Sequence, residues 1–222
     1  MNRATKRKAA FVALLLVWIA AVWLLWWSPI IYPLKLFVVL LHEASHALVA
    51  VATGGEIVRI VVTPDQGGAC YCPGGSAFLT LSAGYLGSLG WGALILTLAR
   101  ARRPEPRTTT TAIGAIVLGL TALYVRNVFG IVFGLLLGVG LLVLRSTGRT
   151  IHVGVLTALG LTSCLYALLD IKSDVLDRPH LQSDAHMLAQ LTGVPTVVWG
   201  VLWIGAGLAL SWWLFRRALA RA

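Results

Sequence analysis

Charged side chains are scarce in this sequence. They make up 12% of its 222 residues, about half the share found in a typical soluble domain. Hydrophobic residues reach 58%, and the mean hydropathy is +0.85. A chain of this length cannot hide so much apolar surface in a core of its own, and the apolar residues come in blocks close to the roughly 20 residues that cross a bilayer. The composition therefore excludes an ordinary soluble domain and predicts a membrane protein.

Acidic residues are the rarer of the two charged kinds, with 8 against 18 basic residues and a net charge of +10. In a soluble protein this excess would suggest nucleic-acid binding. Here the basic residues flank the apolar blocks, as charges that face anionic lipid headgroups do: Arg3, Lys6, Arg7, Lys8, Arg100, Arg102, Arg103, Arg107, Arg145, Arg149, Arg216, Arg217 and Arg221. We therefore expect contact with the lipid bilayer and none with nucleic acid.

Cysteine is also rare, with three residues in the chain. Cys164 lies inside an apolar run and is expected to be a small core residue. Cys70 and Cys72 are too close in sequence to suggest an ordinary structural disulfide. No second pair completes a tetrahedral thiolate site for a metal.

Seven apolar segments predict an all-α polytopic membrane protein of about six to seven transmembrane helices, forming a single domain over residues 1–222. The segments are about 10–28, 34–53, 77–99, 109–125, 128–144, 151–171 and 195–215. The fourth and fifth are joined by Arg126 and Asn127 and form either a tight hairpin or a kinked element. These two polar residues either line a cavity or cap the short segments.

The first segment follows a basic stretch, as in a secretory signal peptide. Its apolar run is long for such a signal and precedes no small-residue cleavage site, so an uncleaved first span is expected. The protein is thus predicted to be a multi-pass protein of a cell membrane, with a bacterial plasma membrane as the expected location. Its orientation stays open, because the N-terminal basic cluster and the Arg100–Arg107 loop predict opposite sides.

Two stretches differ from the spans. Residues 55–76 combine a β-branched run with glycine-rich punctuation and predict a β-hairpin insertion. Non-helical backbone at membrane depth is tolerated where protein covers it or where it lines a water-filled cavity. The polar loop of about 172–194 contains Asp174, Asp177, His180, Asp184 and His186. Within it, Ser183 is predicted to be the N-cap of a short helix with Asp184 in the first turn.

The second apolar segment carries the chemistry, because it contains the motif HEASH with His42, Glu43 and His46. Residues i and i+4 share a helix face, so both imidazoles can bind one Zn²⁺ ion. Glu43 lies beside that point and suits the general base of metal-assisted hydrolysis. Ionisable residues near the middle of a span need a metal or a polar cavity.

Tetrahedral zinc needs a third protein ligand besides the two histidines and an open position. Asp170 directly follows an apolar run and is therefore the favoured ligand at membrane depth. Asp184, at the start of the short helix, is the alternative. The remaining acids are less favoured: Glu56, Asp65, Glu105, Asp174 and Asp177.

Several motifs in order carry a resemblance to a family: HEASHALVAVATGG, SAGYLGSLGWGAL, YVRNVFG, LYALLDIKSDVLD and SDAHMLAQLTGVPTVVWGVLW. From Leu40 to Trp203 the chain resembles the compact branch of the site-2-protease-like intramembrane metallopeptidases. The resemblance implies zinc held by His42, His46 and an aspartate, with Glu43 as the catalytic residue, and a β-hairpin beside the active site. The Asp-Gly dipeptide that ends the asparagine-proline-rich motif of the larger site-2 proteases is missing here.

These observations predict a zinc-dependent intramembrane endopeptidase acting on a membrane protein or peptide. The alternative is a non-catalytic membrane scaffold or a metal-handling transporter that retains the HExxH helix. A missing third ligand would favour that alternative. The substrate and the oligomeric state are not predicted.

Overall fold

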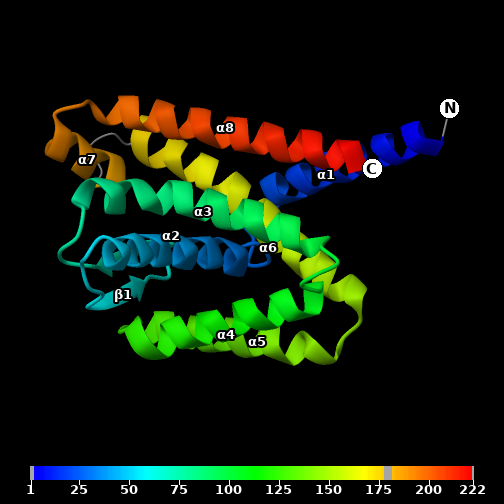
Figure 1. Ribbon diagram of the computed structural model, residues 1–222, viewed down its shortest axis with the longest axis horizontal. Helices are drawn as coiled ribbons and strands as arrows, with labels where there is room; N and C mark the ends of the chain where they lie inside the picture. The colour runs from blue at the N-terminus through cyan, green and yellow to red at the C-terminus, as the bar shows by residue number, and fades with distance from the viewer. Residues whose placement is uncertain (1–2, 178–181, 222) are drawn as a thin grey trace.

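The computed structural model describes residues 3–177 and 182–221 (Figure 1). Residues 178–181 of the predicted polar loop, with His180 among them, lie outside the described residues. The described elements follow one another as α1 (Arg3–Leu24), α2 (Tyr32–Ala52), β1 (Arg59–Val62), β2 (Gly68–Tyr71), α3 (Ala77–Ala99), α4 (Pro106–Tyr124), α5 (Val128–Val143), η1 (Leu144–Ser146), α6 (Arg149–Ile171), η2 (Lys172–Asp177), α7 (Asp184–Thr192) and α8 (Thr196–Arg221).

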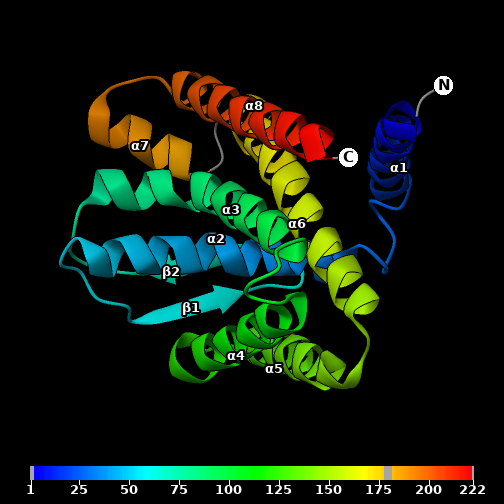
Figure 2. The same cartoon turned by 45° about the vertical axis from the view of Figure 1, so that its right-hand side comes forward.

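The prediction of an all-α polytopic protein with a small β-hairpin is confirmed. Within the described residues, five helices are long and apolar enough to cross a membrane: Tyr32–Ala52, Ala77–Ala99, Val128–Ser146, Arg149–Val175 and Thr196–Leu219. The first and fourth apolar segments form the helices α1 and α4. Helices α4 and α5 lie side by side in both views, so the two short segments form a tight helical hairpin (Figures 1 and 2).

Helix α2 occupies the middle of the structure. It lies between α3 on one side and the β-hairpin with the α4–α5 pair on the other, while α6 crosses behind and α8 covers the outer side of α3 and α6 (Figure 2). The main core joins Leu36 and Phe37 of α2 to Ile60 of β1 and Leu156 of α6, all of them fully buried. The HExxH helix is therefore enclosed by protein, as a span that contains Lys35, His42, Glu43 and His46 requires.

The hairpin expected at residues 55–76 is present. Strands β1 and β2 pair antiparallel, with Ile60 opposite Cys70 and Val62 opposite Gly68. Ile60 and Val62 alternate with exposed or half-buried residues and point into the core, which fixes the face that the hairpin presents to α2.

The structure corrects one prediction about this hairpin, because Cys70 and Cys72 are paired as a disulfide. The two residues lie at the end of β2, where their Cα atoms are 5.6 Å apart. This separation lies within the usual range for disulfide-bonded cysteines. Cys164 is buried and unpaired, as predicted.

A buried cation ties the connection between α1 and α2 to the bundle. The Lys35 ammonium of α2 donates to the Trp26 carbonyl at 2.9 Å and lies over the Trp26 and Trp27 rings. Trp26 in turn stacks on Tyr166 of α6, with ring centroids 5.6 Å apart. These contacts provide the partners that an ammonium group inside a membrane span needs.

Candidate metal centre

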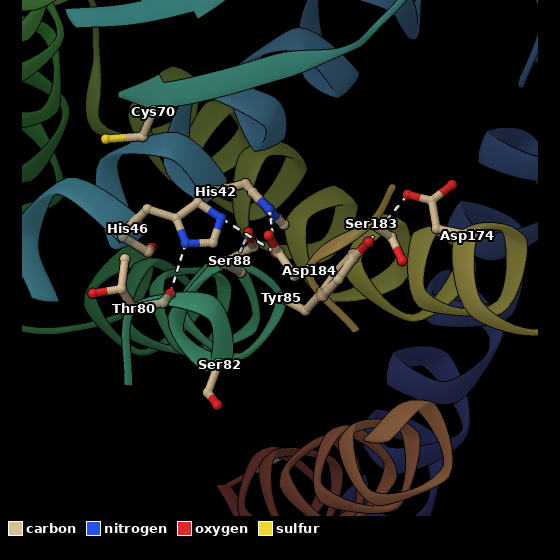
Figure 3. A network of polar contacts seen from close by, with 12 residues as sticks. His42, His46, Cys70, Thr80, Ser82, Tyr85, Ser88, Asp174, Ser183 and Asp184 are labelled. Carbon is tan, nitrogen blue, oxygen red and sulfur yellow. Dashed lines mark hydrogen bonds and ion pairs between the residues drawn. The ribbon is translucent and has the colours of Figure 1, made fainter. Parts of the chain in front are cut away.

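The two histidines of α2 point toward one carboxylate. His42 and His46 lie one helical turn apart, and their Nε2 atoms are 2.9 and 3.2 Å from Oδ2 of Asp184 (Figure 3). Their rings meet edge to face, with centroids 4.7 Å apart. The i, i+4 spacing therefore places both imidazoles on the same side of the helix, as expected.

Asp184 reaches this point because α7 folds back onto α3. The Ser183 hydroxyl accepts from the backbone N–H of His186 and caps the helix, which confirms the predicted N-cap. Ala185 and Leu188 are fully buried against a cluster that contains Tyr85 and Trp203. This apolar contact fixes the first turn of α7, and Asp184 with it, beside the histidines.

The three side chains fit a bound divalent metal. One nitrogen of each histidine and one carboxylate oxygen all lie within 4.8 Å of one another. Bonds of about 2.0–2.1 Å in tetrahedral geometry place neighbouring ligand atoms ~3.3 Å apart, close to the two separations from Asp184. Asp184 Oδ2 is buried, and apart from its contacts with the two Nε2 atoms it has no hydrogen-bond partner among the described residues. Two imidazoles and a carboxylate with an open fourth position are a donor set typical of catalytic zinc.

The charges around Asp184 favour its ionised form, which is the form that binds a cation. Burial by itself raises the pKa of Asp184, but attraction to His46 and His42, when their imidazoles are protonated, lowers it by more. Its pKa therefore lies below the ordinary value, and the side chain is a carboxylate at neutral pH. A metal cation at the same point would stabilise the carboxylate in the same way.

A backbone carbonyl of α3 fixes the tautomer of His46. Nδ1 of His46 lies 2.7 Å from the carbonyl oxygen of Thr80. A carbonyl accepts and cannot donate, so Nδ1 carries the proton. The Nε2 lone pair of neutral His46 then faces Asp184, an arrangement that requires a cation or a proton between them. Such outer contacts commonly orient metal-binding histidines.

Glycine makes room for the imidazoles at the closest approach of α3. A Cβ atom on Gly84 would lie 2.6 Å from Nε2 of His46 and nearer still to Nε2 of His42. Gly87 and Gly92 likewise contact Ser45 and Cys164, whereas Gly90 faces open space. Glycine thus allows close helix packing at three of these four positions, and Gly84 also shapes the candidate site.

Glu43 lies on the hairpin side of the same cavity, which has a volume of about 1620 Å³. Its carboxylate is buried and accepts a hydrogen bond from the backbone N–H of Cys70. A Cβ atom on Gly68 would come within 2.8 Å of the Glu43 carboxyl carbon. Strand β2 therefore passes directly over Glu43, and glycine is what allows it to do so.

Of the two aspartates weighed from the sequence, the structure brings Asp184 and not Asp170 against the histidines. Asp170 belongs to α6 and lines the cavity, but it lies outside the group of converging donor atoms. Asp170 was favoured because it directly follows an apolar run in the sequence. The packing of α7 instead determines that the carboxylate of Asp184 reaches the histidines. Glu56 and Asp65 lie in the hairpin region outside that group as well.

Sequence reasoning missed Tyr85. Its ring meets the His42 ring edge to face at 4.8 Å, and its hydroxyl donates to Asp174 at 3.1 Å (Figure 3). Tyr85 thus connects the candidate metal centre to the η2 segment. No spacing in the sequence marks this residue, although it directly follows Gly84 in the motif SAGYLGSLG.

A known protein family matches most of the chain. The model of the Peptidase M50B-like family matches residues 15–214. The chain belongs to this family. The resemblance to site-2-protease-like intramembrane metallopeptidases is thereby confirmed, and an M50B-like domain with five span-forming helices is a multi-pass membrane protein. No curated protein and no solved structure matches the chain significantly.

The geometry around Gly84 generates the first prediction. Gly84→Ala should weaken zinc binding at least about tenfold, because its methyl group would displace both imidazoles from their common point. Zinc competition with a chelator measures the change. Gly90→Ala is the matched control on the same helix, since a Cβ atom there meets nothing within 4 Å. Wild-type zinc affinity in a folded Gly84→Ala protein would contradict the proposed position of the metal.

Proposed function

We propose that this M50B-like protein is a zinc-dependent intramembrane endopeptidase that hydrolyses peptide bonds of membrane-embedded substrates. The observation that carries the proposal is the convergence of His42, His46 and Asp184 in a cavity that also contains Glu43. Family membership supports it, because the M50 peptidases are zinc metallopeptidases.

In this proposal His42, His46 and Asp184 hold the zinc, with Asp184 in place of the Asp170 favoured from the sequence. Bound zinc would supply a Lewis acid that polarises the scissile carbonyl and lowers the pKa of a water molecule. Thr80 keeps the proton of His46 on Nδ1, and the packing of α7 holds Asp184 in position. The second role of Asp184 is to balance part of the cation's charge in an apolar environment.

Glu43 is the proposed general base. It follows His42 directly in α2, and its carboxylate lies in the same cavity without being one of the three converging donors. It takes a proton from the attacking water and delivers it to the leaving amine, so that one residue serves both halves of the reaction. The Cys70 N–H orients the carboxylate for this task.

The substrate is proposed to bind in an extended form along β2. A transmembrane helix satisfies its own backbone hydrogen bonds, so a helical substrate must unwind before it can be cleaved. Strand β2 pairs with β1 on one side, and within the described residues no strand pairs with its other edge. Residues 67–72 line the cavity beside Glu43, where an unwound segment would find main-chain partners.

The alternative, a scaffold or metal-handling transporter, accounts less well for the arrangement. A missing third ligand would have favoured it, yet Asp184 supplies a third donor atom. A transporter also has no need of a second carboxylate, such as that of Glu43, held beside the metal by the backbone of β2. The presence of Glu43 at that position supports the hydrolase.

The second prediction separates catalysis from metal binding. Glu43→Gln should retain about one zinc per chain and lose at least about a hundredfold in kcat, because the amide keeps the shape of the side chain and removes the base. Cleavage of a membrane-embedded substrate in reconstituted vesicles measures kcat. The control is Glu56→Gln, which alters an exposed glutamate near the hairpin and outside the cavity. Wild-type cleavage by Glu43→Gln would rule out Glu43 as the base.

The third prediction concerns the third ligand. Asp184→Asn should lose zinc, because an amide is a far weaker ligand than a carboxylate, while the isosteric Asp170→Asn should keep it. Zinc content of the two purified variants gives the comparison. Retention by Asp184→Asn together with loss by Asp170→Asn would restore the assignment made from the sequence.

A further inference from the structure

The connection between α4 and α5 runs alongside β1. Ile60 forms a parallel bridge with Val125, and the backbone N–H of Arg126 donates to the Ile60 carbonyl at 3.1 Å. Residues 125–127 thus act as a short third strand on the side of β1 that faces away from β2. Neither Arg126 nor Asn127 lines the catalytic cavity.

Asn127 extends this pairing with its side chain. Its Oδ1 accepts from the backbone N–H of Val62 at 3.2 Å, and its Nδ2 donates to the Val62 carbonyl at 2.7 Å. Both main-chain groups of one strand residue are therefore satisfied by one amide. We call these two hydrogen bonds the amide clamp.

Two further features show that the clamp is built into the fold. Asn127 occupies the N-cap position of α5, where asparagine normally accepts from the helix, yet its side chain makes no capping hydrogen bond. Gly130, one turn further along α5, leaves the space that the amide fills. A Cβ atom at Gly130 would lie 2.6 Å from Oδ1 of Asn127.

The pairing of β1 with β2 connects the amide clamp to Glu43, the proposed general base. Val62 is paired with Gly68, and Gly68 lies against the Glu43 carboxylate. The position of β1 therefore sets the position of β2 over Glu43. In the turn that follows Val62, the Pro64 carbonyl accepts a hydrogen bond from the Tyr32 hydroxyl at 2.7 Å, which holds the turn.

We propose that Asn127 is a positioning residue that fixes the free edge of β2 relative to Glu43 and so sets where an extended substrate lies. This role rests on the proposed peptidase function. Asn127 touches neither the metal ligands nor the substrate edge, and it acts through β1. Its loss should therefore weaken substrate binding while the metal centre stays intact.

The test compares Asn127→Ala with wild type in the full-length protein in lipid. Hydrogen exchange of the Val62 amide should become at least about tenfold faster, because its acceptor is gone. Zinc content should not change, and KM for a membrane-embedded substrate should rise with a smaller change in kcat. Asn127→Asp should also disturb the clamp, since its carboxylate keeps the acceptor for Val62 N–H but places a second oxygen against the Val62 carbonyl in place of the donor.

Three further variants separate the effect of the clamp from a general effect of substitution in this region. Gly130→Ala should reproduce the Asn127→Ala effects by crowding Oδ1, whereas Gly140→Ala on the same helix meets nothing within 4 Å and should behave as wild type. Arg126→Ala is the neighbouring control, because the Arg126 guanidinium donates to the carbonyls of Ala122, Leu123 and Val125 and to none in the hairpin.

Unchanged exchange at Val62 in Asn127→Ala would overturn the clamp. Faster exchange with unchanged KM would overturn the positioning role. Failure of the proposed function would look different, because the wild-type protein would then cleave nothing while the exchange difference at Val62 persisted.

Discussion

Ionisable groups inside an apolar helical bundle need partners, and this requirement organises the structure around α2. His42, Glu43 and His46 all lie within one turn or so of a membrane-span helix, where each uncompensated charge or polar group is costly. The surrounding elements provide the compensation. Thr80 accepts from His46, Asp184 faces both histidines, and the hairpin backbone donates to Glu43.

The same requirement applies to the hairpin, because non-helical backbone at membrane depth must also be satisfied. Strand β1 meets β2 on one side and residues 125–127 on the other, with the Asn127 amide completing the pairing at Val62. In the part of the chain that the structure describes, no strand pairs with the other edge of β2, which lies beside the cavity. This edge is the proposed place for an extended substrate, whose own backbone would pair with it.

Much of this arrangement follows from local sequence signals. The apolar segments, the HExxH spacing, the hairpin and the Ser183 cap each depend on residues close together in the chain, and each prediction of structure among them is confirmed. The position of Asp184 depends instead on the burial of Ala185 and Leu188 against Tyr85 and Trp203, which come from three separate helices. No local pattern encodes that packing, and ranking aspartates by their distance from a span favoured Asp170. The amide clamp could not be predicted from the sequence for the same reason, since Asn127 and Val62 are 65 residues apart in the chain.

X-ray absorption at the zinc edge of the purified full-length protein tests the central claim most directly. The account predicts four-coordinate zinc with two imidazole nitrogens and oxygen ligands at about 2.0–2.2 Å, and loss of this spectrum in Asp184→Asn. Sulfur ligands at about 2.3 Å would instead require cysteine thiolates, such as a reduced Cys70–Cys72 pair, and would contradict a centre built on His42, His46 and Asp184.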